Sequence, residues 1–148
     1  MKKILCLSSL FALLAFAPAI GAEVIGVVNF DKIVDSYSKV KSVSDEISDK
    51  YSEIQRYTLD KEREYKKLST PLERKNFEEA TTRELNKKQE AYLKLKEKKE
   101  TEIDNSIKAA IKQVAIDNHV NTVVEQTVIF YGGVDLTDKV VKYLNTSK

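Results

Sequence analysis

The stretch KKLSTPLERK, residues 66–75, interrupts a long run of charged residues and contains Pro71. The segment TPLE (70–73) within it has the pattern of a capping box, with threonine as N-cap, proline as the first helical residue and glutamate as the third. Lys66 and Lys67 just before it suit the negative end of a preceding helix. The stretch therefore predicts that one helix ends and another begins here. A single helix kinked at the proline is the alternative.

Helical periodicity extends on both sides of this turn. From Tyr37 to Leu72, apolar residues recur at alternating spacings of three and four, as the seam of a coiled coil requires. A less regular series continues from Phe77. We therefore predict a long antiparallel helical coiled-coil hairpin over residues 37–117, with its tip near residues 69–71.

The two ends of the chain outside the hairpin carry the strand-forming residues. VIGVVNF (24–30) is a dense β-branched and aromatic run, and NTVVEQ (121–126) and TVIFY (127–131) predict two more strands. DLTDKVVKYLN (135–145) predicts a short amphipathic helix with Asp135 as its N-cap. The hairpin is therefore expected to be an insertion between strands that come from both ends of the chain.

Residues 23–36 and 118–148 form the expected body, which has 45 residues and no cysteine. A body of this size is near the lower limit for an independent core without disulfides or metal, and its sheet edges are open. Pooling of strands between several copies would solve both problems. The predicted fold class is α+β, with the long hairpin inserted into a small β-strand oligomerisation body.

Residues 1–22 predict a cleavable secretory signal. Lys2 and Lys3 precede an apolar run, residues 4–16, that is shorter than the roughly 20 residues of a membrane-spanning helix. Small residues follow this run, and we expect cleavage after Ala22. An uncleaved membrane anchor is the alternative. The signal predicts that the protein leaves the cytoplasm.

The charge of the chain is balanced overall but uneven along its length. The formal net charge is +2, and it disappears when Lys2 and Lys3 leave with the signal. This balance does not suggest a nucleic-acid-binding protein. Residues 58–99, however, carry 13 basic and 9 acidic side chains. The surplus keeps the hairpin soluble, or it attracts acidic partners or anionic lipid headgroups.

The sequence offers little for catalysis. His119 is the only histidine, and Cys6, the only cysteine, leaves with the signal, so no His/Cys metal cluster or cysteine nucleophile is expected. Acidic pairs fall in charged helix, where a solvated face is the ordinary explanation. Gly132 and Gly133 predict a turn and not a phosphate loop. We expect no enzyme, no cofactor and no metal.

Several of these features converge on one family. The signal is followed by IGVVNFDKIVDSYSKVKSVSDEI (25–47), the interrupted charged hairpin, and NHVNTVVEQTVIFYGGVDLTDKVVKYLN (118–145). In this order and at these lengths they resemble the OmpH/Skp family of periplasmic chaperones, over essentially the whole mature chain. The resemblance implies a homotrimer whose strands form a small shared β-barrel, from which the hairpins hang as three tentacles around a cavity. It also implies that unfolded outer-membrane proteins are held there without ATP.

We therefore predict a periplasmic, ATP-independent holdase chaperone that prevents aggregation of unfolded outer-membrane proteins. The client is expected to meet a diffuse surface of aromatic, aliphatic and basic side chains on the inner faces of the arms: Tyr57, Tyr65, Leu68, Leu72, Phe77, Arg83, Leu85, Lys87, Lys88, Tyr92 and Lys94. The trimer interface is expected to consist of apolar residues from the predicted strands: Val24, Ile25, Val27, Val28, Phe30, Val123, Val124, Val128, Ile129 and Phe130.

One departure from the family and one alternative function stay open. Well-studied relatives are strongly basic, whereas the mature chain is formally neutral, so charge-led binding should be weaker or confined to the outer hairpin. The lipopolysaccharide site proposed for some relatives does not carry over to individual residues here, and a weak contact with anionic lipid or lipopolysaccharide is left open. The alternative is a structural or scaffolding coiled coil of the envelope that binds one fixed partner or an anionic membrane.

Overall fold

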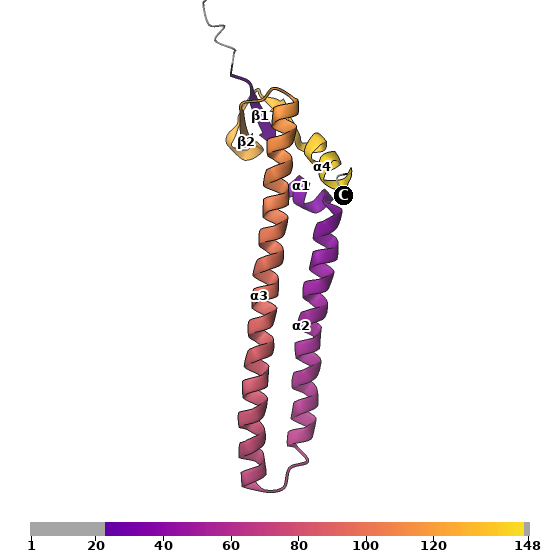
Figure 1. Cartoon of the computed structure of the whole chain (residues 1–148), viewed down its shortest axis with the longest axis vertical. Helices are drawn as coiled ribbons and strands as arrows, with labels where there is room; N and C mark the ends of the chain where they lie inside the picture. Colours follow the sequence, from indigo (N-terminus) through magenta and orange to yellow (C-terminus); the bar gives the residue numbers. More distant parts are fainter. Residues whose placement is uncertain (1–22, 147–148) are drawn as a thin grey trace, which may run out of the picture.

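The computed structural model describes residues 23–146, so the predicted signal, residues 1–22, lies outside the described residues. Two long helices run side by side along the molecule, and a small sheet with two short helices lies at one end of them (Figure 1). The chain is thus mostly helical with a small sheet, which confirms the α+β class. We call α2 together with residues 71–106 of α3 the arm, and the remaining described residues the body.

The sheet has three parallel strands, and the N-terminal strand is the central one. Strand β1 (Ile25–Val28) pairs with β2 (Thr122–Glu125) on one edge and with β3 (Val134–Asp135) on the other. Both partners of β1 lie about a hundred residues further along the chain. The long helices therefore form an excursion that leaves the sheet after β1 and returns to it at β2.

A left-handed residue turns the chain from the end of α3 (Pro71–Asp117) into β2. His119 has φ 56°, the backbone amide of Val120 donates to the carbonyl of Ala115 at 2.9 Å, and Asn118 is the C-cap. This is the Schellman arrangement, in which a residue with positive φ satisfies the last helical carbonyls and reverses the chain. The reversal lets β2 run parallel to β1.

The third strand lies at a different position from the one that the sequence predicted. TVIFY (127–131) is not a strand: residues Gln126–Val128 form a short 3₁₀ helix, η1, and the strand β3 follows the two glycines. Both edges of β1 are occupied by β2 and β3, so a further strand would have no edge of β1 to pair with in this chain. A segment with high β propensity forms a strand only where another strand is available to pair with it.

A short helix, which the residue pattern alone did not separate from the rest of the body, follows β1. Helix α1 (Phe30–Ser36) occupies residues that were assigned partly to the strand. Its N-cap Asn29 accepts a hydrogen bond from the backbone amide of Lys32 at 2.8 Å, and the Glu125 carboxylate accepts one from the amide of Phe30 at 3.1 Å. These bonds satisfy amides that have no partner inside the helix. The chain breaks at Tyr37, and α2 (Ser38–Tyr65) begins directly after it.

The core of the body extends beyond the two chain ends. Ile33, Ile107, Leu136 and Val140 are completely buried, and burial of each aliphatic side chain contributes about 2 kcal/mol. The cluster comprises Val28, Ile33, Tyr37, Ile107, Ala110, Val114, Ala115, Val120, Leu136, Val140 and Leu144. Four of these residues lie on the last turns of α3. The long helix therefore supplies part of the core that the chain ends lack.

Close approach at the centre of the sheet requires a glycine in β1. A Cβ atom on Gly26 would lie 2.8 Å from Cγ1 of Val120 and 2.9 Å from Cδ1 of Leu136. Both neighbours belong to the packed core, where there is little room to move. The glycine thus lets the turn after α3 and the segment before α4 close over the strand.

The capping box at the tip of the arm is confirmed. Thr70 Oγ1 accepts from the backbone amide of Glu73 at 3.2 Å, and Glu73 Oε2 accepts from the amide of Thr70 at 3.0 Å, with Pro71 as the first helical residue. The hydrogen bonds from Thr70 hold the pKa of Glu73 below its ordinary value. One helix ends at Tyr65 and another begins at Pro71, so the alternative of a single kinked helix is wrong.

The last helix, α4 (Thr137–Thr146), begins two residues later than predicted. Asp135 still binds its N-terminal end, because its carboxylate accepts from the amide of Thr137 at 2.8 Å. Hydrogen bonds from Thr137 hold the pKa of Asp135 below its ordinary value. The predicted apolar face is confirmed: Leu136 and Val140 are completely buried and Leu144 nearly so.

Replacement of Thr137 by valine should destabilise the body. Thr137 is 2% exposed, and its Oγ1 accepts from the backbone amide of Asn29 at 3.0 Å. Valine keeps the shape and removes the acceptor, so we expect a loss of about 1–2 kcal/mol in the free energy of unfolding. Chemical denaturation at a fixed protein concentration measures it. Thr101→Val, an exposed change on α3, is the control and should cost less than about 0.5 kcal/mol; equal losses in both variants would contradict the role of the Thr137 hydroxyl.

Candidate functional site

The two helices of the arm leave much of their shared seam open. Val43 and Ile54 are the only buried residues of α2, and no residue between 71 and 106 of α3 is buried. Ile54, a member of the predicted seam series, is buried, and so is Val43, which lies outside that series. The arm therefore carries a strip of half-exposed apolar side chains along its length.

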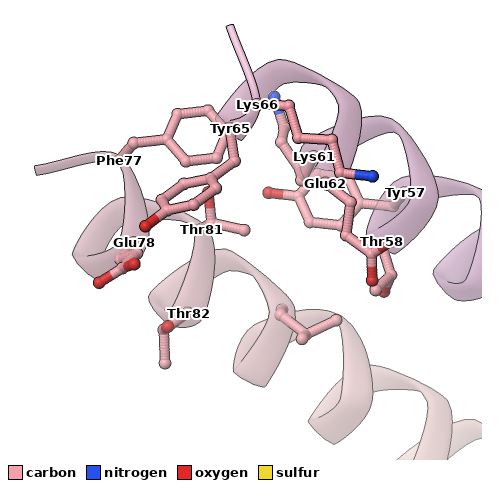
Figure 2. A pocket seen from close by; sticks show the side chains of 11 residues that line it. Tyr57, Thr58, Lys61, Glu62, Tyr65, Lys66, Phe77, Glu78, Thr81 and Thr82 are labelled. Atoms are coloured by element: carbon pink, nitrogen blue, oxygen red, sulfur yellow. The ribbon is translucent and has the colours of Figure 1, made fainter. Parts of the chain in front are cut away.

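Near the tip this strip deepens into a groove of about 300 Å³ between α2 and α3. Its walls are mainly rings and methyl groups, with charged side chains at the edge (Figure 2). The residues that line it are Tyr57, Thr58, Lys61, Glu62, Tyr65, Lys66, Phe77, Glu78, Thr81, Thr82 and Leu85. Three of them are threonines, where a closely packed coiled coil would have larger aliphatic side chains. The small side chains leave the hollow unfilled.

Aromatic rings and ammonium groups are interleaved in this groove. The rings of Tyr65 and Phe77 lie with centroids 6.2 Å apart and planes tilted by 46°. The Lys61 ammonium is 5.6 Å from the centroids of both Tyr57 and Phe77, and it also pairs with Glu64 at 2.6 Å. A cation–π contact at an exposed site stabilises only weakly. The rings of the groove are therefore in contact with cations while they stay partly exposed.

A carboxylate lies next to the ring pair. In Figure 2 the Glu78 side chain lies beside the Tyr65 hydroxyl, and the interaction with this carboxylate raises the pKa of Tyr65. The Tyr65 ring thus has the Glu78 carboxylate next to its hydroxyl and the Arg74 guanidinium 5.7 Å from its centroid. A fixed ring offers an apolar surface at a low cost in conformational entropy.

The predicted client residues fall into three groups in the structure. Tyr57, Tyr65, Phe77 and Leu85 come together in the groove. Leu68 and Tyr92 are half-buried elsewhere on the seam, where Tyr92 packs on Tyr51 with ring centroids 5.9 Å apart. Leu72, on the first turn of α3, is 68% exposed.

The predicted basic residues are less available than their number suggests. Lys87 and Lys94 pair with Glu84 and Glu90 on their own helix, at 3.7 and 2.6 Å. Lys88 pairs with Glu53 of α2 at 3.2 Å, and its ammonium also lies 5.1 Å from the centroid of the Tyr57 ring. Arg83 borders a shallow depression that is also lined by Glu78 and Glu79. The charged surface is thus a mixture of both signs.

Sequence reasoning missed Thr81 and Thr82, two of the threonines that line the groove. Thr81 lies four residues after Phe77 and four before Leu85, so the helical spacing places all three on one face. That signal was present, but the less regular series that starts at Phe77 passed over Thr81. Its significance depends on the residues opposite it, which only the pairing of α2 with α3 supplies.

The apolar residues predicted for the subunit interface differ widely in exposure. Val27 and Val28 are 7% and 4% exposed and already pack within the chain. Val24, Phe30, Val123, Val124 and Ile129 are half-buried. Ile25 is 41% exposed and Val128 68%, and Phe130 is fully exposed. Its neighbour Tyr131, which was not predicted, is 98% exposed.

The exposed residues belong to a loop that crosses the sheet. Residues 126–133 connect β2 to β3, and a Cβ atom on Gly133, which has φ 92°, would lie only 2.5 Å from Cγ2 of Val27. The loop thus touches the central strand at its glycine end, while the side chains of Val128, Phe130 and Tyr131 are exposed to solvent. A run of exposed large apolar residues is typical of an interaction surface.

Residues 23–146 lack two other kinds of site. None of the helices there is both long enough and apolar enough to cross a membrane. In the same residues, histidine, cysteine and acidic side chains do not gather in groups of three or more that could hold a metal ion.

Fold and surface together define a class: an α+β protein with a long projecting helical arm, an aromatic groove near its tip and an apolar loop on its body. The family model described as "Outer membrane protein (OmpH-like)" matches residues 24–144. The chain therefore belongs to the OmpH-like family, which confirms the resemblance drawn from the sequence. No curated protein matches the sequence.

Ion pairs between the two helices should make the arm sensitive to acid. Hydrogen bonds from Lys50 and then from Lys88 hold the pKa of Glu53 below its ordinary value of 4.5. A carboxylate with a lowered pKa stabilises the fold above its unfolded pKa, and this contribution is lost as the pH falls through the lower, folded value.

We therefore expect Glu53→Gln to speed amide exchange in the middle of α2 at neutral pH but not well below pH 4.5. Exchange rates of both proteins, each corrected for the intrinsic pH dependence, measure the difference. Glu97→Gln, a change of the same kind at an exposed position of α3, is the control. A difference between Glu53→Gln and the wild type that persists undiminished in acid would contradict the assignment.

Proposed function

We propose that the chain is a periplasmic, ATP-independent holdase that binds unfolded outer-membrane proteins and prevents their aggregation. The observation that carries the proposal is the open seam of the arm, which leaves the aromatic groove formed by Tyr57, Tyr65, Phe77 and Leu85 unfilled. A structural coiled coil gains its stability by burying such a seam. Membership of the OmpH-like family supports a chaperone of outer-membrane proteins.

The arm is suited to many weak contacts. Its apolar side chains are half-exposed, and many of the charges around them are paired with a neighbour on the same helix. An unfolded chain has no fixed shape, so it is better held by a long surface of small contacts than by one deep pocket. We propose that the predicted client residues act in this way, with the groove as the strongest contact.

The body is suited to a homotrimer. Val128, Phe130 and Tyr131 form an exposed apolar run next to a sheet of three short strands, whose outer edges on β2 and β3 have no further strand among residues 23–146. Unpaired edges and exposed aromatic residues are both covered when chains associate. We propose that the loop and these edges join three copies into a shared barrel, with the three arms around a cavity.

The N-terminal residues of the sequence support export of the protein from the cytoplasm. Residues 1–22 have the charged, apolar and small-residue segments of a cleavable signal, and the matched family region begins at residue 24. We propose that the mature protein starts near residue 23 and works in the periplasm, without cofactor, metal or nucleic acid.

Loss of the Tyr65 and Phe77 rings should weaken client protection. In Tyr65→Ala/Phe77→Ala, we expect the concentration of chaperone that halves aggregation of an unfolded outer-membrane protein to rise about fivefold, because aromatic contacts contribute about 0.5–1.5 kcal/mol each. Light scattering during dilution of the client from urea measures it. Leu93→Ala, at a 60% exposed position of the same arm, is the control. Wild-type protein that gives no protection would contradict the holdase proposal.

Disruption of the exposed loop should dissociate the oligomer. We expect the wild type to have three times the mass of one chain, and Phe130→Asp to shift the mass toward that of a single chain, because a buried unpaired charge costs several kcal/mol. Sedimentation equilibrium measures both. Leu59→Asp, at a 52% exposed position of the arm, should keep the wild-type mass. A wild type that is a monomer would contradict the trimer.

The tip of the arm favours an anionic membrane as the second candidate. Leu72 is 68% exposed there, and Lys66, Lys67 and Lys75 surround the same turn. An apolar residue among basic ones is a surface that anionic headgroups attract. Sedimentation with vesicles containing anionic lipid tests it: salt-sensitive binding without any protection of unfolded clients would favour this function over the holdase.

A further inference from the structure

One side chain of the C-terminal helix bonds to both sides of the break between α1 and α2. The Oδ1 atom of Asn145 accepts from the backbone amide of Ser38 at 3.0 Å and from the Ser38 hydroxyl at 2.9 Å. Its Nδ2 atom donates to the carbonyl of Ser36 at 2.9 Å. The three bonds connect residues more than 100 positions apart in the sequence.

These bonds replace a cap that α2 lacks. Its N-cap residue, Tyr37, makes no side-chain hydrogen bond to the helix. The first amides of a helix have no partner inside it, and a side-chain oxygen normally supplies one from the N-cap residue itself. Here the oxygen comes from the side chain of Asn145 on α4. The side-chain nitrogen of Asn145 donates to the carbonyl of Ser36 at the end of α1.

The two helices of the arm are attached to the body in different ways. Helix α3 continues without a break into the core, where Ile107, Ala110 and Val114 are buried. Helix α2 begins after the break at Tyr37, so its backbone can change direction there. The base of α2 is held by the buried side chain of Tyr37, by Val40, which packs against the same core, and by the bonds to Asn145. Because α3 is fixed by three core residues of its own, a change in the spacing at the arm base would be a change in the position of α2.

Other attachments of α2 to α3 are weaker. Beyond Val43 and Ile54, its contacts are half-buried side chains and ion pairs such as Glu46 with Lys99, at 2.6 Å. Exposed ion pairs of this kind contribute little and are screened by salt. Asn145 is also exposed, but it stands on a helix that Val140 and Leu144 hold in the core, and it makes three hydrogen bonds at one place. Figure 1 shows the end of α4 beside the α1–α2 junction.

We propose that Asn145 is a positioning residue that clamps the base of α2 to the body and thereby sets the spacing between the two helices of the arm. The clamp is a property of the fold and does not depend on what the arm binds. Its functional consequence rests on the proposed function: loss of the clamp would widen the arm base and change the surface that a client meets.

Distances between spin labels test the clamp directly. Cysteines replace the exposed residues Lys41 and Asn105 at the base of the arm in one protein, and Gln55 and Gln89 in its middle in another. Both carry Cys6→Ser, since Cys6 is the only cysteine of the chain. Labelled chains are diluted with unlabelled ones, so that only distances within a chain are measured.

We expect Asn145→Ala to broaden and lengthen the base distances while the mid-arm distances change less. Exchange of the Ser38 amide should become about five- to tenfold faster, because its hydrogen bond is lost. Asn145→Asp keeps the acceptor oxygen and loses the donor to Ser36. Its base distances and its Ser38 exchange rate should therefore lie between those of the wild type and Asn145→Ala. Thr146→Ala is the control, because the Thr146 hydroxyl donates only to carbonyls of its own helix in the described chain.

Unchanged base distances and unchanged Ser38 exchange in Asn145→Ala would overturn the proposal. A lowered thermal midpoint with unchanged base distances would overturn it too, since Asn145 would then only stabilise the body. If Asn145→Ala does not fold, the same comparison is made in Asn145→Asp. If Asn145→Ala alters the base distances but the wild type protects no client, the clamp is supported and the holdase is contradicted. The two proposals can therefore fail separately.

Discussion

The whole structure depends on the pairing of β1 with two strands that come about a hundred residues later. A central strand whose partners both lie near the other end of the chain forces everything between them to leave the sheet and return. Two long helices connected by a short capped turn achieve this with few loops, and the parallel direction of β2 requires the reversal at His119. The arm is therefore a consequence of how the body closes.

The body and the arm have opposite packing. The body concentrates its apolar side chains, and helix α3 contributes to that core as well as to the arm. The arm spreads its apolar side chains thinly along a seam that also contains lysine and threonine, so none of its α3 residues is buried. A part of a molecule with few buried contacts has low local stability and opens easily. This property suits the transient capture of unfolded chains that we propose.

Polar side chains form hydrogen bonds at the junctions between successive helices and strands. Glu125 and Asn29 bind the start of α1, Thr137 accepts from the amide of Asn29, and Asn145 bridges α1 and α2. Each of these bonds joins a helix end to a distant part of the chain or to its own cap. Because helix ends carry unpaired backbone groups, they are natural points at which segments from the two chain ends can be fixed together.

Local sequence determined the features that depend on neighbours in the chain: the capping box at Thr70, the helices on either side of it, the apolar face of α4 and the strand character of β1 and β2. It also named four residues that the structure brings together in the groove. Tyr65, Phe77 and Leu85 follow from the helical spacing of the seam, and Tyr57 was named as an aromatic residue of the arm. Tertiary structure alone decided the rest. TVIFY (127–131) has the composition of a strand but no free edge of β1 to join, Thr81 opens a groove only because of what lies opposite it, and Asn145 caps a helix that begins 107 residues earlier in the chain. Each of these outcomes depends on which distant groups meet, and that cannot be read from the pattern of a single segment.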